Sequence, residues 1–195
     1  MVRLPAPRTR KIRAWTVAEA CQFLDSARTE SDPLNTAYVL MLILGLRLGE
    51  ALGLPWDCIN LDTGEVDIAW QLQRAGGQLH YRETKTPGSD APLPLPAICV
   101  AAIKLQGEKQ ATWRIEAGPA WHDTGLLITT RYGTPYEPRN FTRHFAARCL
   151  AAQVRYIRPH GMRRTRASLL AALDVHPRIA MRILRHSKIA LTIEI

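Results

Sequence analysis

The chain has 195 residues, which is enough for one domain of ordinary size. Its hydrophobic content of 47% argues against a disordered chain, and its net charge of +9 favours a polyanionic partner. The longest apolar run, residues 37–46, is too short to cross a bilayer, so the sequence does not predict a membrane-spanning protein.

The N-terminal third is predicted to be helical after a short arm. Residues 1–15 are basic and rich in proline, which is typical of a linker. A helix is expected to begin at Thr16, because Glu19 completes a capping box with it. The apolar residues 34–45 predict a buried helix, and residues 50–54 continue helically.

A small antiparallel sheet is expected over residues 66–95. Two stretches with strand composition flank the Gly76–Gly77 turn, and the proline-rich residues 91–96 predict a third, edge strand. Helical patterns then return over residues 97–116, 138–152, 160–173 and 177–184. The predicted fold class is therefore α+β, mainly α with a small antiparallel β-sheet.

The positive charge is concentrated in the C-terminal third of the chain. Residues 131–188 contain thirteen Arg and Lys but only two acidic residues, Glu137 and Asp174. A single charge run is usually a solvated surface, but an excess over so long a segment favours binding to nucleic acid. The four cysteines form no CxxC pair and follow no signal peptide, which predicts buried, reduced thiols in a cytosolic protein.

Arg47 directly follows the most apolar run of the chain. An unpaired guanidinium is costly to bury, so Arg47 needs a partner, and Glu50 lies three residues further along a predicted helix. The pair has two interpretations. It is a structural ion pair at a helix start, or it holds an arginine rigidly in the core for bidentate recognition of phosphate.

Three further residues are candidates for chemistry. His160 and Arg163 are three residues apart, so on a helix they project from one face, although such a pair also arises by chance. His186 follows a short predicted helix, where an isolated histidine is more often structural. Lys85 lies in a predicted turn between strands, where a lysine is usually only exposed but can also reach a leaving-group oxygen.

These residues lie in four local sequences that resemble the tyrosine recombinase (phage integrase) family. The sequences are GLRLGEALGL around Arg47, TKTPGSDAPLPLP around Lys85, HGMRRTRASLL from His160, and LRHSKIALTIEI around His186. They occur in the order and at the separations of the family, and the resemblance covers residues 16–195. It implies the fold of the tyrosine recombinase catalytic domain.

The resemblance also implies a mechanism that needs neither a metal nor another cofactor. In this family a tyrosine hydroxyl attacks a backbone phosphate of double-stranded DNA, which gives a 3′-phosphotyrosyl link and a free 5′-hydroxyl. The strands are then exchanged and rejoined, which is site-specific recombination or integration. Cationic side chains neutralise the charge that builds up in the transition state.

Each candidate residue receives a role from its position in the family pattern. Arg47 and Arg163 would bind the non-bridging oxygens, and Glu50 would support Arg47. His160 would assist proton removal from the tyrosine, because a free tyrosine with a pKa of ~10 is a poor nucleophile at neutral pH. Lys85 would protonate the leaving 5′-oxygen and His186 would hydrogen-bond the phosphate. Five more basic residues are predicted DNA contacts: Arg139, Arg143, Arg164, Arg166 and Lys188.

The two ends of the chain depart from the family pattern. The family carries an N-terminal helical domain that clamps DNA, and residues 1–15 are interpreted as the remnant of the interdomain linker. The nucleophilic tyrosine would follow Ile195, and none of the five tyrosines present fits its place. Residues 16–195 are therefore expected to be a C-terminally truncated catalytic domain that does not cleave DNA. We expect a monomer in solution, whereas a full-length family member acts as a tetramer on DNA.

Other functions are weighed against this one. A non-catalytic DNA-binding module with the same fold is the main alternative. A metal-dependent nuclease or transposase would need clustered carboxylates, and the C-terminal third has almost none. Zinc binding is disfavoured because no histidine pair has ligand spacing beside cysteine. We therefore expect a cytoplasmic, DNA-associated protein of bacterial or phage origin.

Overall fold

A computed structural model of the chain describes residues 14–84, 92–176, 178–179 and 183. The α-helices are α1 (Val17–Thr29), α2 (Asn35–Ile43), α3 (Leu48–Leu52), α4 (Ala97–Ala117), α5 (Pro138–Ala151) and α6 (Met162–Ala172). Single 3₁₀ turns are η1 (Trp56–Cys58), η2 (Gly118–Ala120) and η3 (Pro159–Gly161). The strands are β1 (Ile59–Asn60), β2 (Glu65–Val66), β3 (Trp70–Ala75), β4 (Gln78–Glu83) and β5 (Leu93–Pro94). The predicted fold class, mainly α with small antiparallel sheets, is confirmed.

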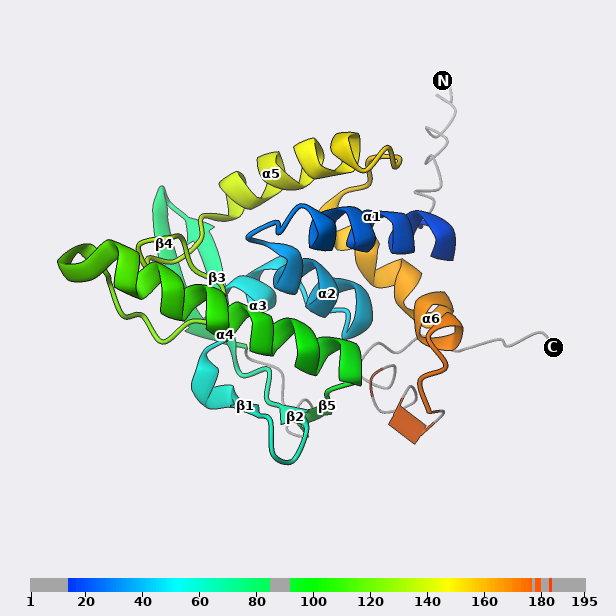
Figure 1. Cartoon of the computed structure of the whole chain (residues 1–195), viewed down its shortest axis with the longest axis horizontal. Helices are drawn as coiled ribbons and strands as arrows, with labels where there is room; N and C mark the ends of the chain where they lie inside the picture. Colours follow the sequence, from blue (N-terminus) through cyan, green and yellow to red (C-terminus); the bar gives the residue numbers. More distant parts are fainter. Residues whose placement is uncertain (1–13, 85–91, 177, 180–182, 184–195) are drawn as a thin grey trace, which may run out of the picture.

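Helix α2 forms the centre of the core. Figure 1 shows it surrounded by α1, α4 and α6, and it packs against all three. Every residue from Thr36 to Ile43 is buried, as the apolar run predicts. Tyr38 packs edge-on against Phe23 of α1 and Phe141 of α5, and burial raises the pKa of its phenol far above the ordinary value.

The predicted start of α1 is confirmed at atomic detail. The Thr16 hydroxyl accepts a hydrogen bond from the Glu19 amide at 3.2 Å, and the Glu19 carboxylate accepts one from the Thr16 amide at 2.8 Å. The preceding residue, Trp15, is buried and its amide donates to the Thr165 hydroxyl of α6 at 3.2 Å. The first helix is thereby tied to the last described one.

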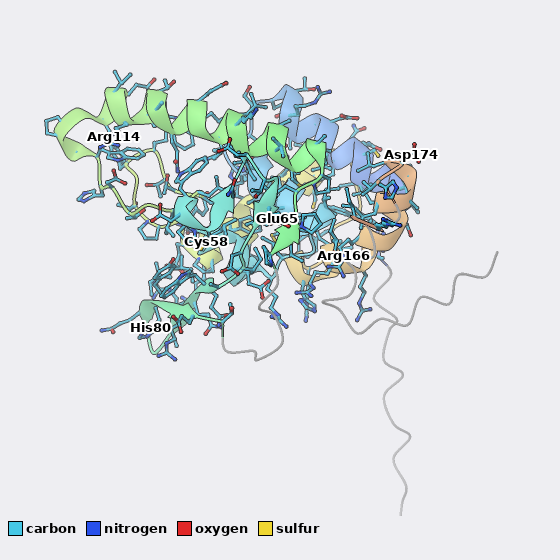
Figure 2. The ribbon with its side chains drawn as sticks, turned by 90° about the horizontal axis from the view of Figure 1, so that it is seen from below. Cys58, Glu65, His80, Arg114, Arg166 and Asp174 are labelled. Atoms are coloured by element: carbon cyan, nitrogen blue, oxygen red, sulfur yellow. The ribbon has the colours of Figure 1, made fainter. Side chains whose placement is uncertain are left out.

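The predicted single sheet is wrong, because residues 59–84 and 92–94, as the structure describes them, form two sheets. β3 and β4 make the expected hairpin, whose turn residues Gly76 and Gly77 have positive φ of 57° and 80°. The proline-rich strand β5 pairs instead with β2, in the order β1-β2-β5. It lies at the edge of that sheet, where a proline without an N–H is tolerated. Among the described residues the hairpin pairs with no third strand, and it projects from the body, as the position of His80 shows in Figure 2.

A buried carboxylate joins the α1–α2 turn to α5. The Asp32 side chain is 2% exposed, and it lies 2.9 Å from His144 Nε2 and 3.2 Å from Arg148 Nε. It also accepts a hydrogen bond from the Leu34 amide at 2.8 Å. The Arg148 Nε contact is close enough for an ion pair but lacks hydrogen-bond geometry. Arg148 compensates by donating to Glu30 at 2.7 Å.

All four cysteines are free thiols, as predicted, but only two of them are buried. Cys99 and Cys149 lie in the core, and burial raises the pKa of the Cys149 thiol to about 12. Cys21 and Cys58 are partly exposed, so the prediction of burial is wrong for them. None of the helices in the described part of the chain is both long and apolar enough to span a membrane.

Candidate functional site

The α2–α3 turn places Arg47 at the surface. Helix α2 ends at Ile43, and Gly45 reverses the chain with a φ of +68°, a conformation that glycine adopts without strain. Arg47 then becomes the N-cap residue of α3. Its side chain is 60% exposed, so the expectation of a guanidinium rooted in the core is wrong. The backbone of Arg47 directly follows the buried residues of α2, but its guanidinium group faces solvent.

The predicted partner of Arg47 is confirmed. Arg47 donates to Glu50 twice: its amide to Oε2 at 2.7 Å, and Nη1 to Oε1 at 2.7 Å. The Glu50 side chain is only 8% exposed, so it is the fixed member of the pair. A buried carboxylate that binds both ends of one arginine restricts that side chain to a narrow range of positions. Within the described residues, the Arg47 guanidinium hydrogen-bonds only to Glu50, through Nη1.

Arg163 approaches this pair from the other end of the sequence. It lies in the first turn of α6 and is partly buried. Burial lowers the pKa of the Arg163 guanidinium, the nearby charge of Glu50 raises it, and that of Arg47 lowers it. The charges of both Glu50 and Arg47 therefore act on Arg163, which indicates that the three side chains lie near one another.

His160 lies one turn before Arg163, although not on the predicted helix. The helix expected over residues 160–173 begins only at Met162, and His160 occupies the 3₁₀ turn η3. Pro159 occupies the first position of that turn, where its missing N–H costs nothing. The imidazole is exposed to solvent at the same end of α6 as Arg163.

Lys85, His186 and Lys188 lie outside the described residues, as does most of the predicted helix 177–184. The structure does describe Thr84, the residue immediately before Lys85. Thr84 closes the open end of the β3–β4 hairpin, because its amide donates to the Ala69 carbonyl and its hydroxyl to the Ile68 carbonyl, each at 2.8 Å. The residue immediately before Lys85 is thus held by two hydrogen bonds.

The hairpin packs directly on α3, the helix that begins after Arg47. Gly49 of α3 and Gly53, its C-cap residue, face the backbone of β3, where a Cβ on Gly53 would lie 2.6 Å from the Leu72 nitrogen. Further along β3, Arg74 forms a bidentate ion pair with Glu137, the N-cap residue of α5, with both distances 2.8 Å. That pairing lowers the pKa of the Glu137 carboxyl. No sequence pattern indicates this ion pair, because its residues lie 63 positions apart.

The predicted DNA contacts fall into two groups. Arg139 and Arg143 on α5 and Arg164 on α6 are exposed. Arg166 is only 2% exposed and donates to the Leu44 carbonyl at 2.9 Å, so the expectation that it is a solvated, DNA-contacting charge is corrected. The physical reason is the missing side chain of Gly45, which leaves space for the guanidinium inside the protein. The Gly45 in the first arginine motif was the one sequence signal for this arrangement.

Comparison with known proteins places these features in a family. The profile of the phage integrase family matches residues 14–195. An integrase of Streptomyces ambofaciens is 30% identical over 95% of this chain and 49% of its own length. A XerC-like tyrosine recombinase of Caldanaerobacter subterraneus is 25% identical over 83% of this chain and 44% of its own length. The chain thus spans about half the length of these relatives.

Solved structures agree on the fold. The Tn1549 transposon integrase in complex with a circular intermediate DNA has a TM-score of 0.70 at 20% identity, covering 92% of this chain and 60% of its own. The lambda integrase catalytic core has a TM-score of 0.55 at 17% identity, covering 89% of this chain and 94% of its own. The chain belongs to the phage integrase family and has the tyrosine recombinase catalytic-domain fold.

Proposed function

We propose that this protein acts in site-specific DNA recombination, as the part of a tyrosine recombinase that binds and activates the scissile phosphate. The observation that carries the proposal is the Arg47–Glu50 ion pair, with Arg163 near enough to be affected by the charges of both residues. Two neighbouring guanidiniums, one at the start of α3 and one in the first turn of α6, can together bind a single phosphate. The proposed partner is double-stranded DNA, and the Tn1549 integrase structure was determined with DNA.

The proposed chemistry follows from the charges of this site. Arg47 and Arg163 donate to the non-bridging oxygens and neutralise the charge that develops as the phosphorus gains a fifth ligand. Glu50 accepts from Nη1 of Arg47 and so directs the rest of that guanidinium outward. His160 takes the proton of the attacking tyrosine hydroxyl. Lys85 would protonate the leaving 5′-oxygen and His186 would donate to the phosphate, in segments outside the described residues.

We propose that residues 16–195 serve as the catalytic domain, that residues 1–15 are a linker, and that this chain alone does not cleave DNA. In the family pattern the nucleophile follows the motif of His186, whereas all five tyrosines precede His160. Tyr38 is buried in the aromatic core, and Tyr81 is stacked on Trp70 of the hairpin at 4.7 Å. A covalent protein–DNA adduct formed by this chain on a nicked duplex would contradict the proposal.

DNA binding supplies the direct test of the arginine pair. We expect the chain to bind duplex DNA with an affinity that falls steeply with salt, because counterions are released from the phosphates. Arg47→Ala and Arg163→Ala are each expected to weaken binding about tenfold and to reduce the salt slope by about 1. Fluorescence anisotropy of a labelled duplex over a salt series measures both quantities.

Arg114→Ala is the matched control for this test. Arg114 lies on α4, is 63% exposed and pairs with Asp123 at 3.2 Å. Figure 2 shows it near the far end of α4, away from the arginine pair's helix α6. We expect its removal to change the affinity about twofold at most, because it loses the same charge at a distant position. An equal loss of DNA affinity in all three variants, or an affinity that does not depend on salt, would contradict the proposal.

A further inference from the structure

Arg166 is the largest side chain that is fully buried in the described part of the protein. Its Nη1 donates to the Leu44 carbonyl at 2.9 Å, while its Nε has no hydrogen-bond partner among the described residues. Burial, together with the charge of Arg163, lowers the pKa of the Arg166 guanidinium to about 10. A buried cation next to a like charge is unfavourable, and an apolar side chain of similar shape would pack there at lower cost. Its presence therefore calls for an explanation other than stability.

The group that Arg166 holds is the end of the helix before Arg47. Leu44 is the C-cap residue of α2, and its carbonyl is one of those that a helix end leaves without an internal partner. A cation at this end is also favoured by the helix dipole. The guanidinium packs tightly against Gly45, because a Cβ on Gly45 would lie 2.2 Å from Nη1 and 2.9 Å from Cδ of Arg166. The guanidinium lies against the very turn that directs Arg47 outward.

The other end of the same side chain is rooted in the helix that carries Arg163. Residues 163 and 166 are three apart on α6, so they share one face of that helix. Arg166 thus links α6, which carries Arg163, to the turn before Arg47. Helices α2 and α6 pack together, and this hydrogen bond joins the turn after α2 to α6.

We propose that Arg166 is a positioning residue that fixes the Arg47 turn against α6 and so sets the separation of the Arg47 and Arg163 guanidiniums. The inference rests on the proposed role of these two arginines in binding phosphate. Arg166 itself touches neither the phosphate nor solvent. Its removal should therefore act on DNA binding through Arg47, rather than as the loss of one more charge.

A double-mutant cycle between Arg166→Met and Arg47→Ala tests this inference. Affinity for a labelled duplex is measured at a temperature well below the melting point of every variant, so that stability losses do not enter. Arg47→Ala alone is expected to cost about tenfold, whereas in the Arg166→Met background it should cost threefold or less, a coupling of about threefold typical of contacting groups. A merely structural role of Arg166 would lower the melting temperature and leave the two effects on affinity additive.

Two further variants make the outcome unambiguous. Arg114→Met removes the same charge at a distant exposed position, and the Arg47→Ala penalty is expected to stay at about tenfold in that background. Arg166→Lys keeps the cation and a donor near the Leu44 carbonyl, and it is expected to restore part of the Arg47 penalty. It also carries the test if Arg166→Met does not fold.

The possible results separate this inference from the proposed function. An Arg47→Ala penalty that is the same in the unmodified, Arg166→Met and Arg166→Lys backgrounds overturns the positioning role and leaves the proposed function intact. If Arg47→Ala costs nothing in the unmodified chain, the phosphate-binding role of Arg47 fails, and the inference fails with it. A reduced penalty in the Arg166→Met background alone, with the Arg114→Met background unchanged, supports the positioning role.

Discussion

Replacing Asp32 by alanine is expected to lower the free energy of unfolding by about 3–5 kcal/mol, the cost of breaking a buried ion pair by removing one partner. The Asp32 carboxylate is 2% exposed and faces both His144 and Arg148 of α5. Without it, the 13% exposed Arg148 loses a buried counter-charge and the Leu34 amide loses its acceptor. Urea unfolding followed by circular dichroism measures the loss.

Asp25→Ala is the control for this prediction. Asp25 pairs with Arg28 at 3.5 Å, and both side chains are about 70% exposed to solvent (69% and 72%). The expected change is about 0.5 kcal/mol or less, because water screens such a pair. A similar small change for Asp32→Ala would show that the buried network contributes no net stability. In that case apolar packing and the backbone hydrogen bonds of the α1–α2 turn would hold it in place.

Gly53→Ala is expected to destabilise the protein by about 3 kcal/mol, at the upper end of the range for overpacking. The added Cβ would lie 2.6 Å from the Leu72 nitrogen and 2.7 Å from the Gln71 carbonyl carbon. Both are backbone atoms of β3, so no flexible side chain can move aside to make room. The strand and the helix must separate, and thermal unfolding reports the loss.

Gly107→Ala provides a control of opposite sign. Gly107 lies within α4, and a Cβ there would meet only the Trp56 ring, at 3.4 Å. Alanine is a better helix former than glycine, so this variant is expected to gain about 0.5–1 kcal/mol. Equal melting temperatures for Gly53→Ala and the unmodified chain would contradict the close α3–β3 contact.

The contact at Gly53 also matters for the proposed site. Helix α3 begins at the residue after Arg47, and the hairpin it contacts ends at Thr84, next to Lys85. A displacement of α3 relative to β3 would therefore change the distance between Arg47 and the segment that carries Lys85. The bidentate Arg74–Glu137 ion pair joins the same hairpin to α5. Helices α3 and α5 thus both hold the hairpin that leads to Lys85.

Local chemistry was sufficient to predict many of the elements. The Thr16–Glu19 capping box, the Gly76–Gly77 hairpin turn and the apolar run of α2 each depend on neighbours a few residues away. Such patterns are legible because the interacting groups are close in sequence. The pairing of β5 with β2 was predicted incorrectly, because strand partners are chosen by the whole fold rather than by the strand's own residues.

The sequence by itself determined the family, the α+β fold class and the identity of the Arg47–Glu50 pair, because these follow from motifs and from residues three positions apart. Only the tertiary structure decided which arginines face solvent. Arg47 follows the most apolar run and is exposed, whereas Arg166 sits in a strongly basic segment and is buried. The reason is that burial depends on space and partners supplied by distant residues: the gap above Gly45 and the Leu44 carbonyl lie more than a hundred residues from Arg166.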